Sequence, residues 1–113
     1  MLTSVQDLEE ILNSTGLSWS RDKAPKKAKY PYLIYSFVSR SKYYASGKVF
    51  KRISSYQVSL FTDGTEQDLS VIEKKFESKG ISYLPFNSIQ GDENNDTITN
   101  FFTYVRVVED GQE

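Results

Sequence analysis

The sequence contains no cysteine and no histidine. Their absence excludes thiol nucleophiles, disulfide bonds, the usual zinc ligand sets and the commonest general base. It is also consistent with a reducing cytoplasm. No stretch approaches the roughly 20 apolar residues of a membrane-spanning helix, and the first ten residues, MLTSVQDLEE, lack the basic and apolar regions of a signal peptide. We therefore expect no cofactor, no structural or catalytic metal and no membrane partner.

Catalytic motifs are missing as well. The sequence has no Walker-type phosphate loop, no dinucleotide-binding glycine pattern, no zinc-protease motif and no nucleophile elbow. The tripeptide at residues 46–48, Ser-Gly-Lys, is a turn sequence, and the pairs Glu9/Glu10 and Glu73/Glu77 are expected on exposed helix faces. We therefore predict that the protein is not an enzyme. The alternative, a small enzyme, would need carboxylates or lysines clustered in one pocket.

The chain has 113 residues, 38% of them hydrophobic, and includes eight tyrosines, seven phenylalanines and one tryptophan. This composition and length predict one globular domain over residues 1–113. Charge is unevenly divided: residues 1–52 hold ten Lys or Arg and four Asp or Glu, a net +6, whereas residues 53–113 hold four and eleven, a net −7. Such a division favours either a basic face with an acidic partner or head-to-tail packing of copies. The alternative is that the charges are spread over solvated faces.

Residues 55–80 form the clearest structural unit. The alternation of Tyr56, Val58 and Leu60 predicts a strand, and Phe61 suggests that this strand is central and covered on both sides. Residues 62–64, Thr-Asp-Gly, predict a turn in which the glycine supplies a positive φ. A helix follows, with Thr65 and Asp68 resembling a capping box. Its apolar stripe consists of Leu69, Ile72 and Phe76, and Gly80 ends it.

The remaining elements are predicted on both sides of this unit. Thr3 and Gln6 fit a capping box that opens an N-terminal helix, and residues 17–19 continue as an extended segment in which Trp19 packs on the core. Residues 32–61 predict a long antiparallel hairpin that turns at residues 46–48, with room for a third short strand inside it.

After the second helix, a short strand is expected at residues 81–86, an acidic turn at 90–96 and a long strand at 97–108. The acidic turn lacks the spacing of a calcium loop, so we expect a plain hairpin connection there. Together these elements predict an α+β fold. It consists of a single, mostly antiparallel sheet of four to five strands with two helices packed on one face, in the order α-β-β-(β)-α-β-β.

Two basic segments are candidates for binding. Residues 21–29, RDKAPKKAK, carry cations without interleaved aromatic residues, and we expect a solvated loop. The tip of the long hairpin combines cations, which steer partners, with aromatic rings, which stack on them. The predicted interface residues are Arg40, Lys42, Tyr43, Tyr44, Lys48, Lys51 and Arg52. A nucleic-acid-binding or adaptor module that uses residues 21–52 is the alternative reading.

The pattern of elements resembles a known family. YQVSLFT at residues 56–62 leads into a polar corner and a charged helix, and the last strand ends in FFTYVRVV at 101–108. This is similar to small tail and neck proteins of tailed bacteriophages and of prophages of Gram-positive bacteria, whose segments often read Tyr-x-Val-x-Leu-Tyr/Phe-Thr. YPYLIY at residues 30–35 resembles their Pro-Tyr-x-x-Tyr first strand. The likeness covers residues 28–109 and extends to the element order of lambda-type tail terminators.

The resemblance implies a structural virion protein, a tail terminator or head–tail joining (neck) component. Lambda-type terminators form a hexameric ring that closes the head-proximal end of the tail tube. The implied partners are further copies of the chain, tail-tube proteins and head-connector proteins, with non-specific contact to DNA in the lumen of the ring. The implied location is the cytoplasm of the bacterial host during assembly and then the tail or neck of the virion. The family supplies no catalytic residues, and its long hairpin makes contacts along the axis or between subunits.

Overall fold

A computed structural model describes residues 1–90 and 98–110, apart from the side chain of residue 110. The acidic turn expected at residues 90–96 therefore lies almost wholly outside the described residues. Five strands form one sheet in the order β1-β2-β3-β5-β4. The strands are β1 (Ser18–Arg21), β2 (Tyr32–Ala45), β3 (Lys48–Thr62), β4 (Asn87–Gln90) and β5 (Thr99–Asp110). Only the β1–β2 pair is parallel among these neighbours.

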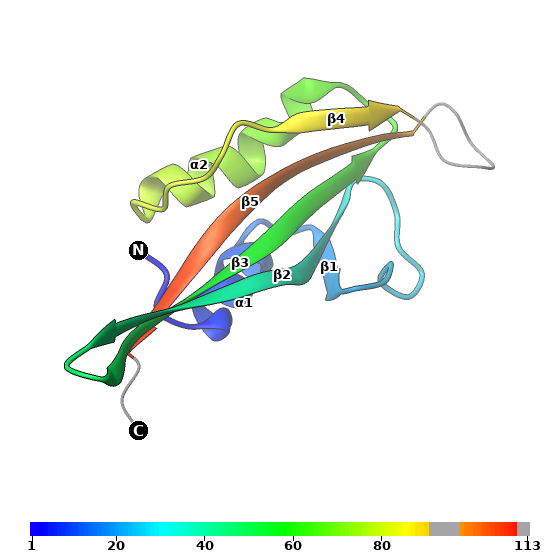
Figure 1. The fold of residues 1–113 in the computed structure, drawn as a ribbon. Coiled ribbons are helices and arrows are strands. Elements are labelled where there is room, and N and C mark those ends of the chain that lie inside the picture. The colour runs from blue at the N-terminus through cyan, green and yellow to red at the C-terminus, as the bar shows by residue number, and fades with distance from the viewer. Residues whose placement is uncertain (91–97, 111–113) are drawn as a thin grey trace.

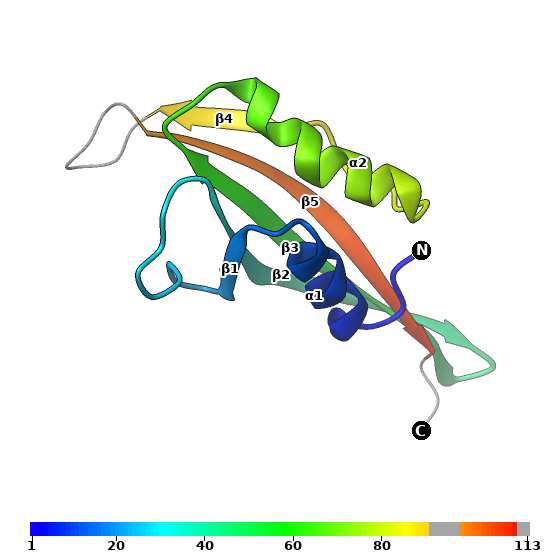
Figure 2. The same cartoon turned by 180° about the vertical axis from the view of Figure 1, so that it is seen from behind.

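Both helices lie on the same face of the sheet, which leaves the other face open (Figures 1 and 2). They are α1 (Val5–Ser14) and α2 (Ser70–Ser78), and a 3-10 turn, η1 (Glu66–Leu69), leads into α2. The predicted α+β class, the single sheet and the placement of the helices are confirmed. The hydrophobic core fills the space between the helices and the sheet. It includes Leu8, Leu12, Ile72 and Phe76 from the helices and Leu33, Tyr35, Val58, Leu60, Val105 and Val107 from the strands.

β3 is the central strand, as its sequence predicted. Tyr56, Val58 and Leu60 are buried under the helices, while Phe61 is half-buried on the opposite face. β3 pairs with β2 on one side and with β5 along its other side, from Thr62 back to Lys51. The buried side of β5 also follows the predicted alternation, since Phe101, Thr103 and Val105 all face the helices. A period of two places every second side chain on the same face of a strand.

Two strand predictions need correction. The expected third strand inside the long hairpin is absent from residues 32–62, where β2 and β3 run without interruption apart from two register shifts. The fifth strand is instead β1, the segment around Trp19 that was expected only to lie on the core. Trp19 does pack there, 6.3 Å from the ring of Tyr35, and its indole nitrogen donates to Asn13 at 3.3 Å.

The strand expected at residues 81–86 begins later, at Asn87. Pro85 has no backbone N–H to donate to a strand ladder. The segment before it follows β5 through isolated contacts: the backbone N–H of Leu84 donates to the carbonyl of Tyr104 at 3.2 Å, and the hydroxyl of Thr103 donates to the carbonyl of Leu84. Tyr83 packs on Phe76 of α2 at 5.4 Å between ring centroids. Side-chain contacts and a single backbone hydrogen bond, rather than a strand ladder, therefore hold this segment.

The helix caps also differ in detail from the predicted capping boxes. Ser4, not Thr3, caps α1 by accepting from the backbone N–H of Asp7 at 3.1 Å, and the Asp7 carboxylate accepts from the N–H and hydroxyl of Thr3. These two bonds to Thr3 lower the pKa of Asp7 below its usual value. Thr65 caps η1 as predicted, whereas the Asp68 carboxylate accepts from the hydroxyl of Thr62.

The space available for a side chain at Gly64 is limited, whereas its backbone conformation does not call for glycine. Its φ is not among the positive values found in the structure. A Cβ atom there would lie 2.5 Å from Oδ2 of Asp68, well inside contact distance. A side chain at this position would therefore require the Asp68 carboxylate to move.

Candidate functional site: the β2–β3 arm

Beyond the helices, β2 and β3 continue as a two-stranded arm, residues 38–52, that projects from one end of the sheet (Figure 1). β1 accompanies β2 only as far as the pair Arg21–Tyr35, and β5 accompanies β3 only as far as Lys51. The arm therefore has strand support at its base and stands free at its tip. All seven predicted interface residues lie in the arm.

A two-residue turn closes the arm. Ala45 pairs with Lys48, and the two residues between them, Ser46 and Gly47, have φ values of 53° and 78°. Positive φ at both central positions is the geometry of the tight hairpin turn that follows the natural twist of strands. Glycine adopts such values without steric cost. The turn predicted from residues 46–48 is thus confirmed.

Apolar side chains are unusually exposed along the arm. Four of the ten large apolar residues exposed in the described part of the chain lie here, and Phe37 adjoins them. The most open are Tyr44, Phe50 and Tyr43, which are 65%, 57% and 54% exposed. Exposed apolar surface gathered in one place is characteristic of an interaction site, whereas scattered apolar residues are ordinary. The arm therefore concentrates exposed apolar side chains in one element.

The cations of the arm differ in how they are held. Arg40 donates to the hydroxyl of Ser54 at 2.8 Å and lies 5.7 Å from the ring of Phe37. Lys51 lies 5.5 Å from the ring of Phe50. Lys42 and Lys48 have no hydrogen-bond or ion-pair partner in the described part of the chain. These two lysines can therefore meet an external anion without giving up an internal contact.

Register divides the arm into two faces. Lys42 pairs with Arg52, and Tyr43 pairs with Lys51. Because successive side chains alternate, Arg40, Lys42, Tyr44 and Arg52 continue the helix-covered face of the sheet. Tyr43, Lys48 and Lys51 continue the open face. The seven predicted residues thus share one element but do not form one continuous patch.

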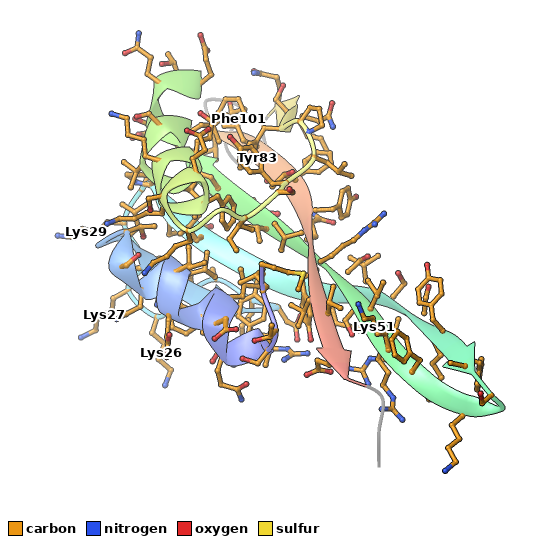
Figure 3. The ribbon with its side chains drawn as sticks, turned by 90° about the vertical axis from the view of Figure 1, so that its left-hand side faces the viewer. Lys26, Lys27, Lys29, Lys51, Tyr83 and Phe101 are labelled. Atoms are coloured by element: carbon orange, nitrogen blue, oxygen red, sulfur yellow. The ribbon has the colours of Figure 1, made fainter. Side chains whose placement is uncertain are left out.

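The second basic segment is separate from the arm. Lys26, Lys27 and Lys29 lie in the loop between β1 and β2, on the opposite side of the molecule from Lys51 (Figure 3). Arg21, at the start of this segment, lies at the end of β1, where its guanidinium is 5.4 Å from the ring of Tyr35. The structure therefore does not gather residues 21–52 into a single basic surface.

Within the described residues, the carboxylates do not form a group of three or more that could hold a metal ion. Glu9 accepts from the hydroxyl of Tyr35, and Glu77 accepts from the hydroxyl of Tyr83 at 2.8 Å. These bonds, together with burial, raise the pKa of each tyrosine to about 12. Glu9 and Glu77, predicted as plain surface groups, thus anchor tyrosines of the sheet and of the 81–86 segment.

Two features were not anticipated from the sequence. On the open face of the sheet the rings of Tyr30, Tyr32 and Phe61 stack in a row, with centroid distances of 5.5 Å and 5.2 Å. On the other side of the sheet, residues from the first 14 positions and from positions 79–81 form a groove of about 280 Å³ between α1 and the end of α2. The alternation of aromatic residues could have indicated the first feature. The groove joins elements too distant in sequence for any local pattern to reveal it.

No helix in the part of the chain that the structure describes is long and apolar enough to cross a membrane. In comparisons with known proteins, no protein-family model matches the chain, and no curated protein matches it significantly.

Proposed function

We propose that the protein is a structural component of a bacteriophage or prophage virion. Its role is that of a tail terminator or head–tail joining (neck) component that assembles as a ring at the end of the tail tube. The observation that carries this proposal is the projecting arm, with its exposed aromatic residues and with Lys42 and Lys48, which have no partner among the described residues. The resemblance of residues 28–109 to small tail and neck proteins supplies the identity of the assembly. This role is mechanical and needs no catalytic group.

In this role the arm is the contact element. Binding sites of proteins that associate combine aromatic anchors with charged groups that set orientation. The arm offers both on two paired strands. The partners would be further copies of the chain, tail-tube proteins and head-connector proteins, with DNA passing through the lumen. The protein would act in the bacterial cytoplasm during assembly and remain in the neck or tail of the virion.

The test combines association with complementation. Size-exclusion chromatography with light scattering, followed by electron microscopy, should show closed rings of the purified protein alone or on isolated tail tubes. Supplied in trans to a phage with an amber mutation in this gene, the protein should restore tails of normal length. A protein that neither joins tail tubes nor restores tail length would refute the proposal.

A second candidate is a nucleic-acid-binding module, favoured by one observation. No acidic residue occurs between Asp22 and Asp63, a stretch that includes the loop and the arm. Binding to phosphates would weaken with rising salt, by a slope of about one log unit per log unit of salt for each contact. Gel shifts with single- and double-stranded DNA at low salt test this candidate. Absence of any shift would eliminate it.

A further inference from the structure

The arm's helix-side face, formed by Arg40, Lys42, Tyr44 and Arg52, presents a cation and a large aromatic ring next to each other. Lys42 and Tyr44 lie two residues apart on β2, so their side chains point the same way. Both are exposed, and Lys42 has no partner within the described residues. A complementary surface must therefore supply a carboxylate beside an apolar wall.

The groove between α1 and the end of α2 has this combination. Its charged lining consists of Asp7 and Glu10 of α1 and Lys79 at the end of α2, so that acids outnumber lysines among these side chains. Its apolar lining includes Leu2, Ile11 and Ile81. At about 280 Å³ it is slightly smaller than the pockets of about 300–1,000 Å³ that hold drug-sized ligands. It therefore suits one or two protruding side chains.

The other large hollow has the wrong charge for this arm. It measures about 430 Å³ and lies between the N-terminal residues, the 80–84 segment and β5. Among the described residues that line it, Arg106 carries a charged side chain and no Asp or Glu is present, so this hollow would repel Lys42 and Arg52. By contrast, residues 1–20 contain Asp7, Glu9 and Glu10 and no Lys or Arg. The positive charge of the arm therefore favours the groove between the helices over this second hollow.

The arm cannot reach the groove of its own molecule. β2 and β3 are paired along the whole arm, and β5 continues the ladder at its base. Bending the arm back onto α1 would break these strand pairs. An arm that fills the groove must therefore come from another molecule.

We infer that the arm of one copy docks into the groove between α1 and α2 of a second copy, with Tyr44 against the apolar wall and Lys42 beside Glu10. This inference rests on the proposed ring, and it names the two surfaces that would meet there. The contact is heterologous, because the arm and the groove are different patches of the same chain. Repetition of such a contact closes a ring when the rotation between copies permits.

Charge reversal provides the first test, measured by sedimentation equilibrium of the full chain. Lys42→Glu and Glu10→Lys should each weaken association by at least about tenfold. The Lys42→Glu/Glu10→Lys double variant should recover most of the loss. Lys48→Glu is the matched control, because it makes the same charge change on the opposite face of the arm. Equal losses in Lys42→Glu and Lys48→Glu, or no recovery in the double variant, would overturn the inference.

Disulfide trapping provides the second test, since the natural chain has no cysteine. Lys42→Cys and Glu10→Cys proteins, mixed and mildly oxidised, should give a cross-linked heterodimer on a non-reducing gel. The control mixture of Lys48→Cys with Glu10→Cys should not. Rings that form without this cross-link would overturn the docking while leaving the proposed function intact. Failure to restore tail length, despite the cross-link, would refute the proposed function and leave the docking in place.

Discussion

At the scale of single residues, Tyr35 joins the sheet to α1. Its ring is fully buried and its hydroxyl donates to the Glu9 carboxylate. Burial is the larger cause, and the bond to Glu9 the next, of the rise in the pKa of Tyr35 to about 12. The ordinary value for tyrosine is about 10. The folded state thus favours the neutral phenol, and this preference stabilises the protein fully below about pH 10 and is lost as the pH rises toward 12.

We therefore expect the free energy of unfolding to fall between about pH 10 and pH 12. Tyr35→Phe should lower it at neutral pH by about 1–3 kcal/mol, since Glu9 loses its donor. In the same variant the free energy of unfolding should fall less steeply between about pH 10 and pH 12. Ionisation of Tyr83, whose pKa is also raised, would account for part of the fall that remains. Urea denaturation at a series of pH values measures both effects. Tyr44→Phe, at an exposed position, is the control, and an unchanged alkaline slope in Tyr35→Phe would contradict the prediction.

The roles of single cap and turn residues could be predicted only in part from the sequence. Thr3 and Ser4 are adjacent hydroxyl residues, and either could begin α1. The backbone decides, because Ser4 has the extended conformation of a cap, with φ −155° and ψ 161°. Gly64 was predicted to have a positive φ, which it lacks, and a side chain there would instead meet the Asp68 carboxylate. Such choices depend on contacts that form only when the chain has folded.

At the scale of elements, α2 covers the half of the sheet nearest β4 and β5 (Figure 2). Phe76 is its fully buried anchor and packs on the ring of Tyr83. Phe76→Ala should lower the free energy of unfolding by about 3–5 kcal/mol, because it removes a large side chain and leaves a cavity. Chemical denaturation measures the loss. Val71→Ala, on the exposed side of α2, should cost less than about 1 kcal/mol, and similar losses in the two variants would show that α2 is not anchored in this way.

The tip of the arm is expected to be dispensable for folding. None of residues 43–51 is buried. Replacing these residues by Asn-Gly would close the hairpin between Lys42 and Arg52, a directly opposed pair, with the preferred two-residue turn. The variant should keep the thermal midpoint within a few degrees and lose self-association, as measured by calorimetry and light scattering. Unfolding of the variant, or unchanged assembly, would contradict this expectation.

The sequence predicted the type of most helices and strands better than it predicted where they end or which elements pack beside them. Alternating apolar residues identified β3 and β5, and the helical stripe identified α2, because burial on one face imposes a fixed period. β1 was not identified as a strand, since four residues give too little pattern to separate a strand from an extended loop. The arm was located from its cations and tyrosines. The groove between the helices escaped prediction because Ile11 and Ile81 meet only in the folded structure.

At the scale of the whole molecule, the net charge of −1 is the sum of a basic first part, residues 1–52, and an acidic second part, residues 53–113. Contacts between an acidic and a basic surface are screened by salt over about 10 Å at 0.1 M ionic strength and about 3 Å at 1 M. Raising sodium chloride from about 0.05 M to about 0.5 M should therefore weaken self-association, as followed by sedimentation. Thermal stability of the monomer should change little over this range. Association that strengthens with salt would instead indicate a contact dominated by apolar surface.

The position of β5 in the sheet has a consequence for the order of folding. Although β5 follows the other four strands along the chain, it lies between β3 and β4. During synthesis, which proceeds at about 5–20 residues per second, the β2–β3 hairpin can close early. One edge of β3 then remains unpaired, and the apolar surface beneath α2 remains uncovered, until β5 has been synthesised. For that interval the nascent chain exposes an unpaired strand edge, the kind of edge that recruits other chains. The protein is thus most vulnerable to misassembly before its correct assembly can begin.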